Sequence, residues 1–232
     1  MREVVGVRVL VVYESVLGNT RAVAEAVATG LRSADRHAVV RCLPAARVLA
    51  EPVEADLVVV GGPTHFFGLP AERTRRLWVE GVLRRGREEG ATASLEPGAV
   101  GPGLREWFDE LACDADAAEG AGGGAAEGGP DGVASAGRRR PVIPPGALAA
   151  AFDTRLDRSM SGGAARRIAQ LLRRHGYHVI ARPKGFVVES IAGPLRAGEQ
   201  ERARAWGAEL GLAAEWWLRA ARDARWIGGS SA

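Results

Sequence analysis

The chain has 232 residues, of which 47% are hydrophobic and 25% are charged, and its formal net charge is +3. This balance is typical of a globular protein with enough apolar material for one sizeable core. The basic residues, nearly all Arg, are scattered among Asp and Glu, which argues against a nucleic-acid-binding surface. No stretch approaches the roughly 20 apolar residues of a membrane span, so we expect a cytoplasmic protein with no membrane segment.

The first part of the chain alternates between apolar runs and amphipathic segments. Residues 7–13 form a nearly continuous apolar run, which indicates a strand covered on both faces. Residues 20–32 place Val and Leu four positions apart, and this spacing predicts a helix. Residues 37–43 and 56–61 predict two more strands, joined through a short helical connection at 45–49. The order strand, helix, strand is typical of a βαβ unit.

The middle of the chain changes in composition. After Pro70 a segment rich in Arg and Glu predicts a helix to about Glu89, and residues 104–111 predict another short helix. Residues 114–140 consist almost entirely of Ala, Gly, Glu and Asp, and end in three consecutive Arg. Such a segment cannot bury enough apolar surface to offset its ordering entropy, so we predict a disordered, low-complexity insertion.

The last part of the chain returns to alternating elements. Residues 146–152 have poor β propensity but lie where the alternation requires a fourth strand. Residues 161–175 predict a helix, and residues 177–188 predict a fifth strand that is interrupted at Pro183. A long final helix is expected from about residue 197.

In that final helix an apolar stripe leads from Trp206 to Trp217, whereas the neighbouring Trp216 is turned away from the stripe. We expect residues 222–232 to be a flexible tail. The two cysteines, Cys42 and Cys113, lack metal-ligand spacing, and we expect idle thiols. The whole pattern predicts a single doubly wound α/β domain over residues 1–232, with a parallel sheet between two layers of helices.

The loop between the first strand and the first helix has the features of a phosphate-binding site. A doubly wound sheet binds its ligand outside the carboxyl ends of its strands. The free N–H groups of a helix N-terminus attract a phosphate, and Gly18 lets the backbone approach closely. Neither a Gly-x-x-x-x-Gly-Lys nor a Gly-x-Gly-x-x-Gly pattern is present, which excludes the two common nucleotide loops. The loop comprises Ser15, Val16, Leu17, Gly18, Asn19 and Thr20.

These residues resemble the flavodoxin family in three places. Residues 11–15 with Gly18-Asn19-Thr20 look like the flavodoxin signature, residues 61–68 resemble its second flavin-binding loop, and residues 151–155 resemble its third. The resemblance implies a flavodoxin-like, five-stranded parallel sheet in the order 2-1-3-4-5, with FMN as the cofactor.

The resemblance also implies a set of binding residues. The first loop would hold the FMN phosphate, and the other two loops would flank the isoalloxazine ring. The second loop comprises Pro63, Thr64, His65, Phe66, Phe67 and Gly68, and the third comprises Asp153, Thr154 and Arg155.

Two departures from the family pattern bear on function. Val16 and Leu17 remove side-chain donors from the first loop but leave its backbone donors, and Arg155 would favour an anionic reduced flavin. An ordinary βα turn with an Asn or Thr cap would also explain the first loop. Two functions therefore stay open. The chain is either an FMN-binding redox protein, as an electron carrier or a small FMN-dependent reductase with an unknown redox partner, or a flavin-free interaction module.

Overall fold

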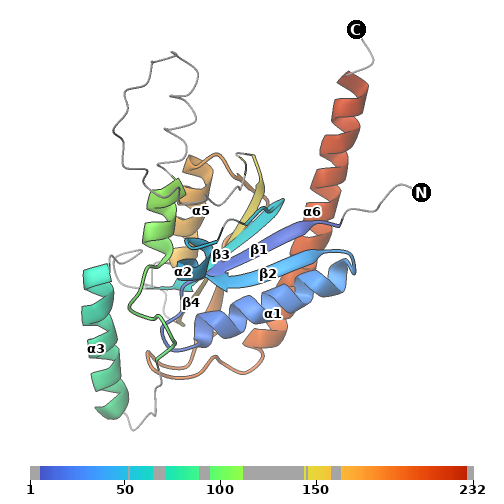
Figure 1. The fold of residues 1–232 in the computed structure, drawn as a ribbon. Coiled ribbons are helices and arrows are strands. Elements are labelled where there is room, and N and C mark those ends of the chain that lie inside the picture. Colours follow the sequence, from blue (N-terminus) through green and yellow to red (C-terminus); the bar gives the residue numbers. More distant parts are fainter. Residues whose placement is uncertain are drawn as a thin grey trace, which may run out of the picture.

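In the computed structural model of the protein, the described residues are 6–51, 53–64, 72–88, 95–111, 144, 146–157 and 163–228. Most of the second loop, from His65 to Gly68, lies outside them, and so does the predicted insertion at 114–140. The described residues form a parallel sheet with helices on both faces (Figure 1).

The first half of the chain follows the predicted order. The apolar run becomes β1 (Arg8–Tyr13), and the residues spaced by four become the buried face of α1 (Asn19–Ala34). Next come β2 (Val39–Pro44), α2 (Ala45–Val48) and β3 (Leu57–Pro63).

The second half begins with α3 (Glu72–Glu88) and a short helix at residues 104–111. Both were predicted from their periodicity. The remaining elements are β4 (Leu148–Leu156), α5 (Ala164–Arg174), β5 (His178–Val179), β6 (Lys184–Val188) and α6 (Glu199–Gly228).

The strand order is β2-β1-β3-β4-β5, as predicted, and every pair in the sheet is parallel. Two short strands share the last position. β5 pairs with Leu148 and Ala149 at the start of β4, and β6 pairs with residues 152–156 at its end. Pro183 lies between β5 and β6. Because proline has no N–H to donate to a neighbouring strand, the fifth strand is interrupted here, as predicted.

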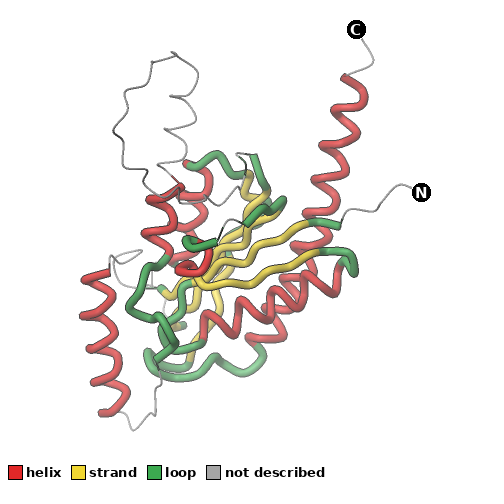
Figure 2. The backbone as a smooth tube through the Cα atoms, viewed as in Figure 1, coloured by secondary structure: helices red, strands yellow, loops and turns green. Residues whose placement is uncertain are grey.

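Two hydrophobic cores cover the two faces of the sheet. Figure 2 shows the helices that lie on both sides of the strands. α1 and α6 pack together on one face, where Leu31, Trp206 and Leu210 are buried. α2, α5 and the helix at 104–111 cover the other face, with Trp107 and Ile168 at the centre of that core. This arrangement is the doubly wound architecture that the sequence predicts.

The central strand β4 is rich in alanine, a residue with low β propensity. Ala149, Ala150 and Ala151 are fully buried, so packing on both faces determines the structure here rather than β propensity. The Phe152 ring that follows lies over the backbone of Gly61 in β3, where any Cβ would overlap the ring. Phe152 also meets Phe186 and Trp206 edge to face, at centroid distances of 6.1 and 6.2 Å.

The last third of α6 departs from the predicted apolar stripe. The buried residues of α6 end at Ala214, whereas Trp217 is partly exposed and Ala221 is exposed. The helix continues beyond the end of the sheet (Figure 1), so Trp217 lies against His178 at the start of β5 and stays partly exposed. Among the described residues, no helix has the length and apolar character to span a membrane.

Candidate functional site

The three candidate loops leave neighbouring strands at one edge of the sheet. β1, β3 and β4 lie side by side and parallel, so their carboxyl ends meet. Backbone hydrogen bonds continue past the strand ends, from Glu14 N–H to the Gly61 carbonyl (2.9 Å) and from Thr64 N–H to the Thr154 carbonyl (2.8 Å). The fold thus brings together the described parts of all three loops.

The first loop leads directly into the N-terminus of α1. Gly18 has a φ of 89°, a left-handed conformation that glycine adopts without strain. Its N–H donates to the Ser15 Oγ at 3.2 Å. Among the described residues, no side chain caps α1, and its first turn holds no acidic residue. The first N–H groups of a 16-residue helix are therefore available to an anion.

Thr20 and Asn19 connect the first loop to other parts of the chain. The Thr20 and Thr154 hydroxyls are 2.8 Å apart and buried, so they join the first loop to the third. The Asn19 amide donates to the Gly193 carbonyl at 2.8 Å, in the segment that follows β6. This last contact could not be predicted from the sequence, because it joins positions 174 residues apart.

The start of α5 completes the edge next to the second and third loops. Ala164 N–H donates to the Thr64 hydroxyl at 3.2 Å, and Ala165 N–H donates to Asp153 Oδ2 at 2.9 Å. Asp153 is fully buried, and its Oδ1 has no hydrogen-bond partner among the described residues. Burial raises the pKa of this carboxyl, against the lowering effect of the Ala165 N–H and of Arg155.

Arg155 is the cation that the sequence places in the third loop. Its Nε lies 3.8 Å from Asp153 Oδ1, and its guanidinium covers Gly185 of β6 so closely that a Cβ there would overlap it. The two opposite charges offset each other. Arg155 is therefore not an isolated positive charge beside the ring position.

Glu96 is a residue near the first loop that the sequence analysis missed. Its N–H donates to the Val16 carbonyl at 2.9 Å, and its carboxylate pairs with Arg21 at 3.1 Å. A Cβ at Gly18 would lie 3.1 Å from Glu96 Oε1, so this carboxylate lies beside the glycine of the loop. An anion bound at the helix N-terminus would experience its negative charge.

The segment around Glu96 also covers Val16. The Val16 side chain is buried against Val79 of α3 and Ala99, with Leu17 and Trp78 packed around them. Val16 and Leu17 thus form the contact between the first loop and α3, together with the residues that follow α3. This packing explains why apolar residues stand at these two positions.

A buried ion pair attaches the same segment to the end of β1. Arg75 of α3, 1% exposed, donates through Nε to Glu14 Oε1 at 3.0 Å and pairs through Nη2 with Glu106 at 2.9 Å. Leu104 N–H donates to the other Glu14 oxygen at 2.9 Å. Glu14 immediately precedes Ser15, so this pair fixes the first residue of the first loop. The sequence signal was a charged residue directly after a buried strand.

The described residues fit the phosphate end of FMN through their backbone. The uncapped N-terminus of α1, the left-handed Gly18 and the Ser15 hydroxyl together form a cradle for a phosphate. Glu96 is the opposing feature, because its charge has the same sign as a phosphate. For the ring, the described candidates are Pro63, Thr64 and the third loop, while His65, Phe66, Phe67 and Gly68 lie outside the described residues.

The predicted idle thiol is found at Cys42 in β2. Burial raises the pKa of the Cys42 thiol to about 12, so little thiolate forms at neutral pH. Cys113 lies outside the described residues.

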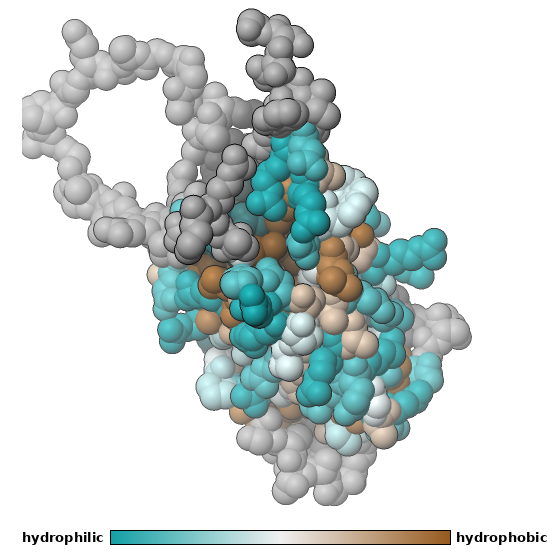
Figure 3. Space-filling model, turned by 90° about the vertical axis from the view of Figure 1, so that its right-hand side faces the viewer, coloured by the Kyte–Doolittle hydropathy of each residue, from teal (hydrophilic) through white to brown (hydrophobic). Residues whose placement is uncertain are grey.

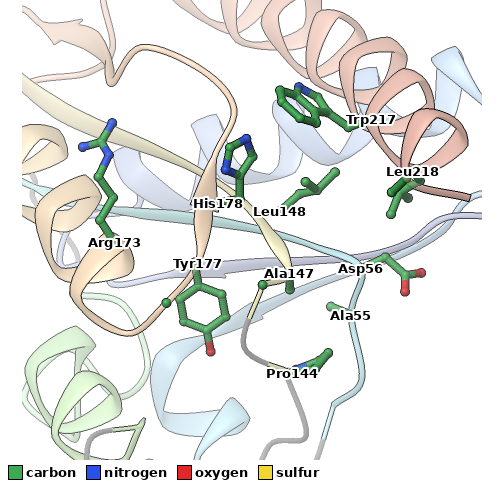
Figure 4. A pocket seen from close by; sticks show the side chains of 13 residues that line it. Ala55, Asp56, Pro144, Ala147, Leu148, Arg173, Tyr177, His178, Trp217 and Leu218 are labelled. Atoms are coloured by element: carbon green, nitrogen blue, oxygen red, sulfur yellow. The ribbon is translucent and has the colours of Figure 1, made fainter. Parts of the chain in front are cut away.

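A second hollow lies at the opposite edge of the sheet (Figure 4). This pocket of about 820 Å³ is bordered by Asp56, Leu148 and His178, at the amino ends of β3, β4 and β5, and by Trp217 of α6. The His178 and Trp217 rings meet edge to face at 4.5 Å. Because ligands of doubly wound sheets bind at the carboxyl edge, this pocket is separate from the candidate site.

The strand order and the loop cluster define a flavodoxin-like α/β protein. Residues 11–109 match the family model described as flavodoxin, which includes the first loop, β3 and the segment with Arg75 and Glu96. This match confirms the resemblance seen in the sequence: residues 11–109 are similar to the flavodoxin family.

Solved structures share the fold at low sequence identity. A flavodoxin from the domain Archaea is 17% identical, with 90% of this chain and 99% of that chain covered and a TM-score of 0.50. A WrbA-like protein from Agrobacterium tumefaciens is 16% identical, over 91% of this chain and 99% of that one, with a TM-score of 0.49. Oxidised flavodoxin 1 from Bacillus cereus is 13% identical, over 87% and 95%, with a TM-score of 0.49. No curated protein sequence matches the chain.

Proposed function

We propose that the protein binds FMN at the carboxyl edge of the sheet and acts as a redox protein, either an electron carrier or a small FMN-dependent reductase. The observation that carries this proposal is the uncapped N-terminus of α1 behind the left-handed Gly18. Flavodoxin-family proteins typically bind flavin, which supports FMN as the ligand. One phosphate-sized loop favours FMN over FAD.

Each residue of the first loop has a distinct role in this proposal. The backbone N–H groups of residues 19 and 20 and the Ser15 hydroxyl hold the phosphate, while Gly18, whose own N–H donates to Ser15 Oγ, lets the backbone approach closely. The Thr20 hydroxyl donates to the phosphate while it accepts a hydrogen bond from Thr154, because a hydroxyl has one donor and two acceptor positions. Val16 and Leu17 hold the covering segment in place rather than contact the ligand.

The third loop supplies the polar groups closest to the ring position. Bound FMN would supply the electron transfer. Asp153, with its unpartnered Oδ1 and raised pKa, is the residue here that can exchange a proton, and Arg155 holds its charged form. Pro63 and Thr64, the described residues of the second loop, lie beside them. We further propose that residues 1–232 form one domain with an insertion at 114–140, and that the protein acts in the cytoplasm with a separate redox partner.

A flavin titration tests the proposal. We expect purified protein to quench FMN fluorescence at a one-to-one ratio and to show a shifted flavin absorbance band, with weaker binding of riboflavin and FAD. Photoreduction of the complex then shows whether one- or two-electron states accumulate. Protein that neither contains flavin nor quenches added FMN would exclude the redox function.

The second candidate is a flavin-free interaction module, and the position of Glu96 favours it. A carboxylate beside Gly18 and paired with Arg21 satisfies part of the positive region that a phosphate would otherwise occupy. In that case the fold presents a surface to another protein and binds no cofactor. Absence of FMN binding both in the wild-type protein and after Glu96→Gln would support this module.

A further inference from the structure

The exposed face of α6 carries a regular stripe that the proposed function does not use. Six residues recur at alternating spacings of four and three, and all six are exposed. On an α-helix this spacing places them within one narrow face, as in a coiled-coil seam. They are Ala205, Glu209, Leu212, Trp216, Arg219 and Asp223.

This stripe points away from the rest of the molecule. The buried side of α6 holds Ala203, Trp206, Leu210 and Ala214, on the opposite side of the helix. Gly207 and Gly211 face α1, since a Cβ at either position would contact that helix. No other described element packs on the stripe, and Leu212 and Trp216 are 60% and 63% exposed.

Leu212 and Trp216 lie one helical turn apart, so their exposed apolar surfaces adjoin, and contiguous apolar surface marks interaction sites more often than a single exposed side chain does. Figure 3 looks onto the side of the molecule where α6 lies and shows hydrophobic areas within a mostly hydrophilic surface. The neighbouring Trp217 differs from Trp216, because it turns toward His178 and the pocket at the sheet edge (Figure 4).

The order of residues along the stripe is self-complementary. In an antiparallel pair of α6 helices centred on position 214, Leu212 of one copy faces Trp216 of the other, and Glu209 faces Arg219. Twofold symmetry makes each of these contacts twice. A parallel pair would instead place Glu209 opposite Glu209 and Arg219 opposite Arg219, which like-charge repulsion disfavours.

We propose that this stripe is a homodimer interface, in which a second copy of the chain packs its α6 antiparallel to the first. The 30 residues of α6 span about 45 Å, and the helix extends past the sheet, so two copies can approach without collision of their sheets (Figure 1). Two Leu–Trp contacts and two ion pairs form a small interface. We therefore expect a dissociation constant on the order of micromolar. In the free chain Arg219 pairs with Glu215 at 2.6 Å, and in the dimer it reaches Glu209 of the second copy.

Charge reversal tests the interface together with its register. We expect the full chain to sediment as a dimer at about 100 μM and to dissociate on dilution. Glu209→Arg alone and Arg219→Glu alone each place like charges opposite one another, and each should be monomeric. An equimolar mixture of these two variants restores both opposite-charge contacts and should form a heterodimer. The double variant, which carries both reversals, also keeps opposite charges facing one another and should form a homodimer.

Two further variants complete the test. Trp216→Ala should weaken the dimer at least tenfold, whereas Arg167→Glu, an exposed reversal on α5 across the sheet, should leave it unchanged. Circular dichroism and melting temperature establish that each variant is folded. A wild-type chain that stays monomeric up to about 500 μM, or single reversals that dimerise like the wild type, would overturn the proposal. So would a mixture of the two single variants that fails to associate.

Discussion

The Thr20 hydroxyl, at the first turn of α1, lies 2.8 Å from the Thr154 hydroxyl at the end of β4. The contact is buried and joins positions 134 residues apart. It connects the loop proposed to hold the FMN phosphate with a loop proposed to flank the ring. A change at Thr20 should therefore lower stability as well as ligand binding, so the test needs a control that separates the two effects.

Thr20→Ala should weaken FMN binding far more than riboflavin binding. A hydrogen bond to a charged group contributes about 1.5 to 3 kcal/mol, which corresponds to about 10- to 100-fold in the dissociation constant. Riboflavin lacks the phosphate and serves as the control ligand, and Thr20→Ser keeps the hydroxyl as the control variant. Equal losses for both ligands in folded protein would show that Thr20 does not contact the phosphate.

Glu96→Gln should strengthen FMN binding by about 3- to 10-fold, which is a Coulomb effect of about 1 kcal/mol at a partly exposed site. The substitution removes a negative charge beside Gly18 and frees Arg21 to attract the phosphate. Fluorescence titrations at low and high salt measure the effect, and the gain should shrink as salt rises. Glu54→Gln, an exposed carboxylate that pairs with Arg8 near the amino end of β3, is the matched control. Unchanged or weaker binding would place the phosphate elsewhere.

Arg75→Met should destabilise the protein by about 3 to 5 kcal/mol, because it leaves Glu14 buried without its cation. The double variant Glu14→Gln with Arg75→Met should cost less than the sum of the single variants, because the two residues are coupled. Chemical denaturation measures all three. Arg76→Met, an exposed neighbour on the same helix, should change stability by less than about 1 kcal/mol. An effect of Arg75→Met no larger than that of Arg76→Met would contradict the buried pair.

Asp153→Asn should stabilise the protein increasingly as pH rises from 4 to 7. Burial raises the pKa of Asp153 in the folded state, so folding favours its protonated form, and the wild type loses that stability as pH rises through the raised pKa. Asparagine keeps an acceptor for the Ala165 N–H but has no proton to lose, so it stays neutral across this range. Melting temperatures of both proteins across this range make the comparison, with the exposed Asp109→Asn as control. A difference that is constant or reversed with pH would refute the assignment.

Replacement of residues 114–140 by a short Gly/Ser linker should leave the fold intact. Loop-closure entropy changes by only about 0.6 kcal/mol per doubling of loop length, and the segment offers little apolar surface. The melting temperature is the measurement. A fall of more than about 10 °C would mean that the segment packs against the domain.

The sequence predicts the layers and the strand order well, because burial on both faces leaves a local signature in strands such as β1 and β3. It predicts β4 from position alone, and the strand exists because its alanines fit between two helix layers. The Gly18-Asn19-Thr20 loop can also be predicted from the sequence, because its residues are contiguous in the chain. Arg75 and Glu96 are not, since their contacts with the first loop bring together residues up to 80 positions apart in the sequence without any repeating pattern.

The contact between Gly61 and Phe152 also limits how this protein can evolve. The Phe152 ring takes up the space that a side chain at position 61 would need, so Gly61→Ala alone forces the ring out of its place between Phe186 and Trp206. A smaller residue at position 152 removes that restriction. The two positions are therefore epistatic: alanine at position 61 costs less once the aromatic ring at position 152 is lost, although loss of this fully buried ring is itself destabilising.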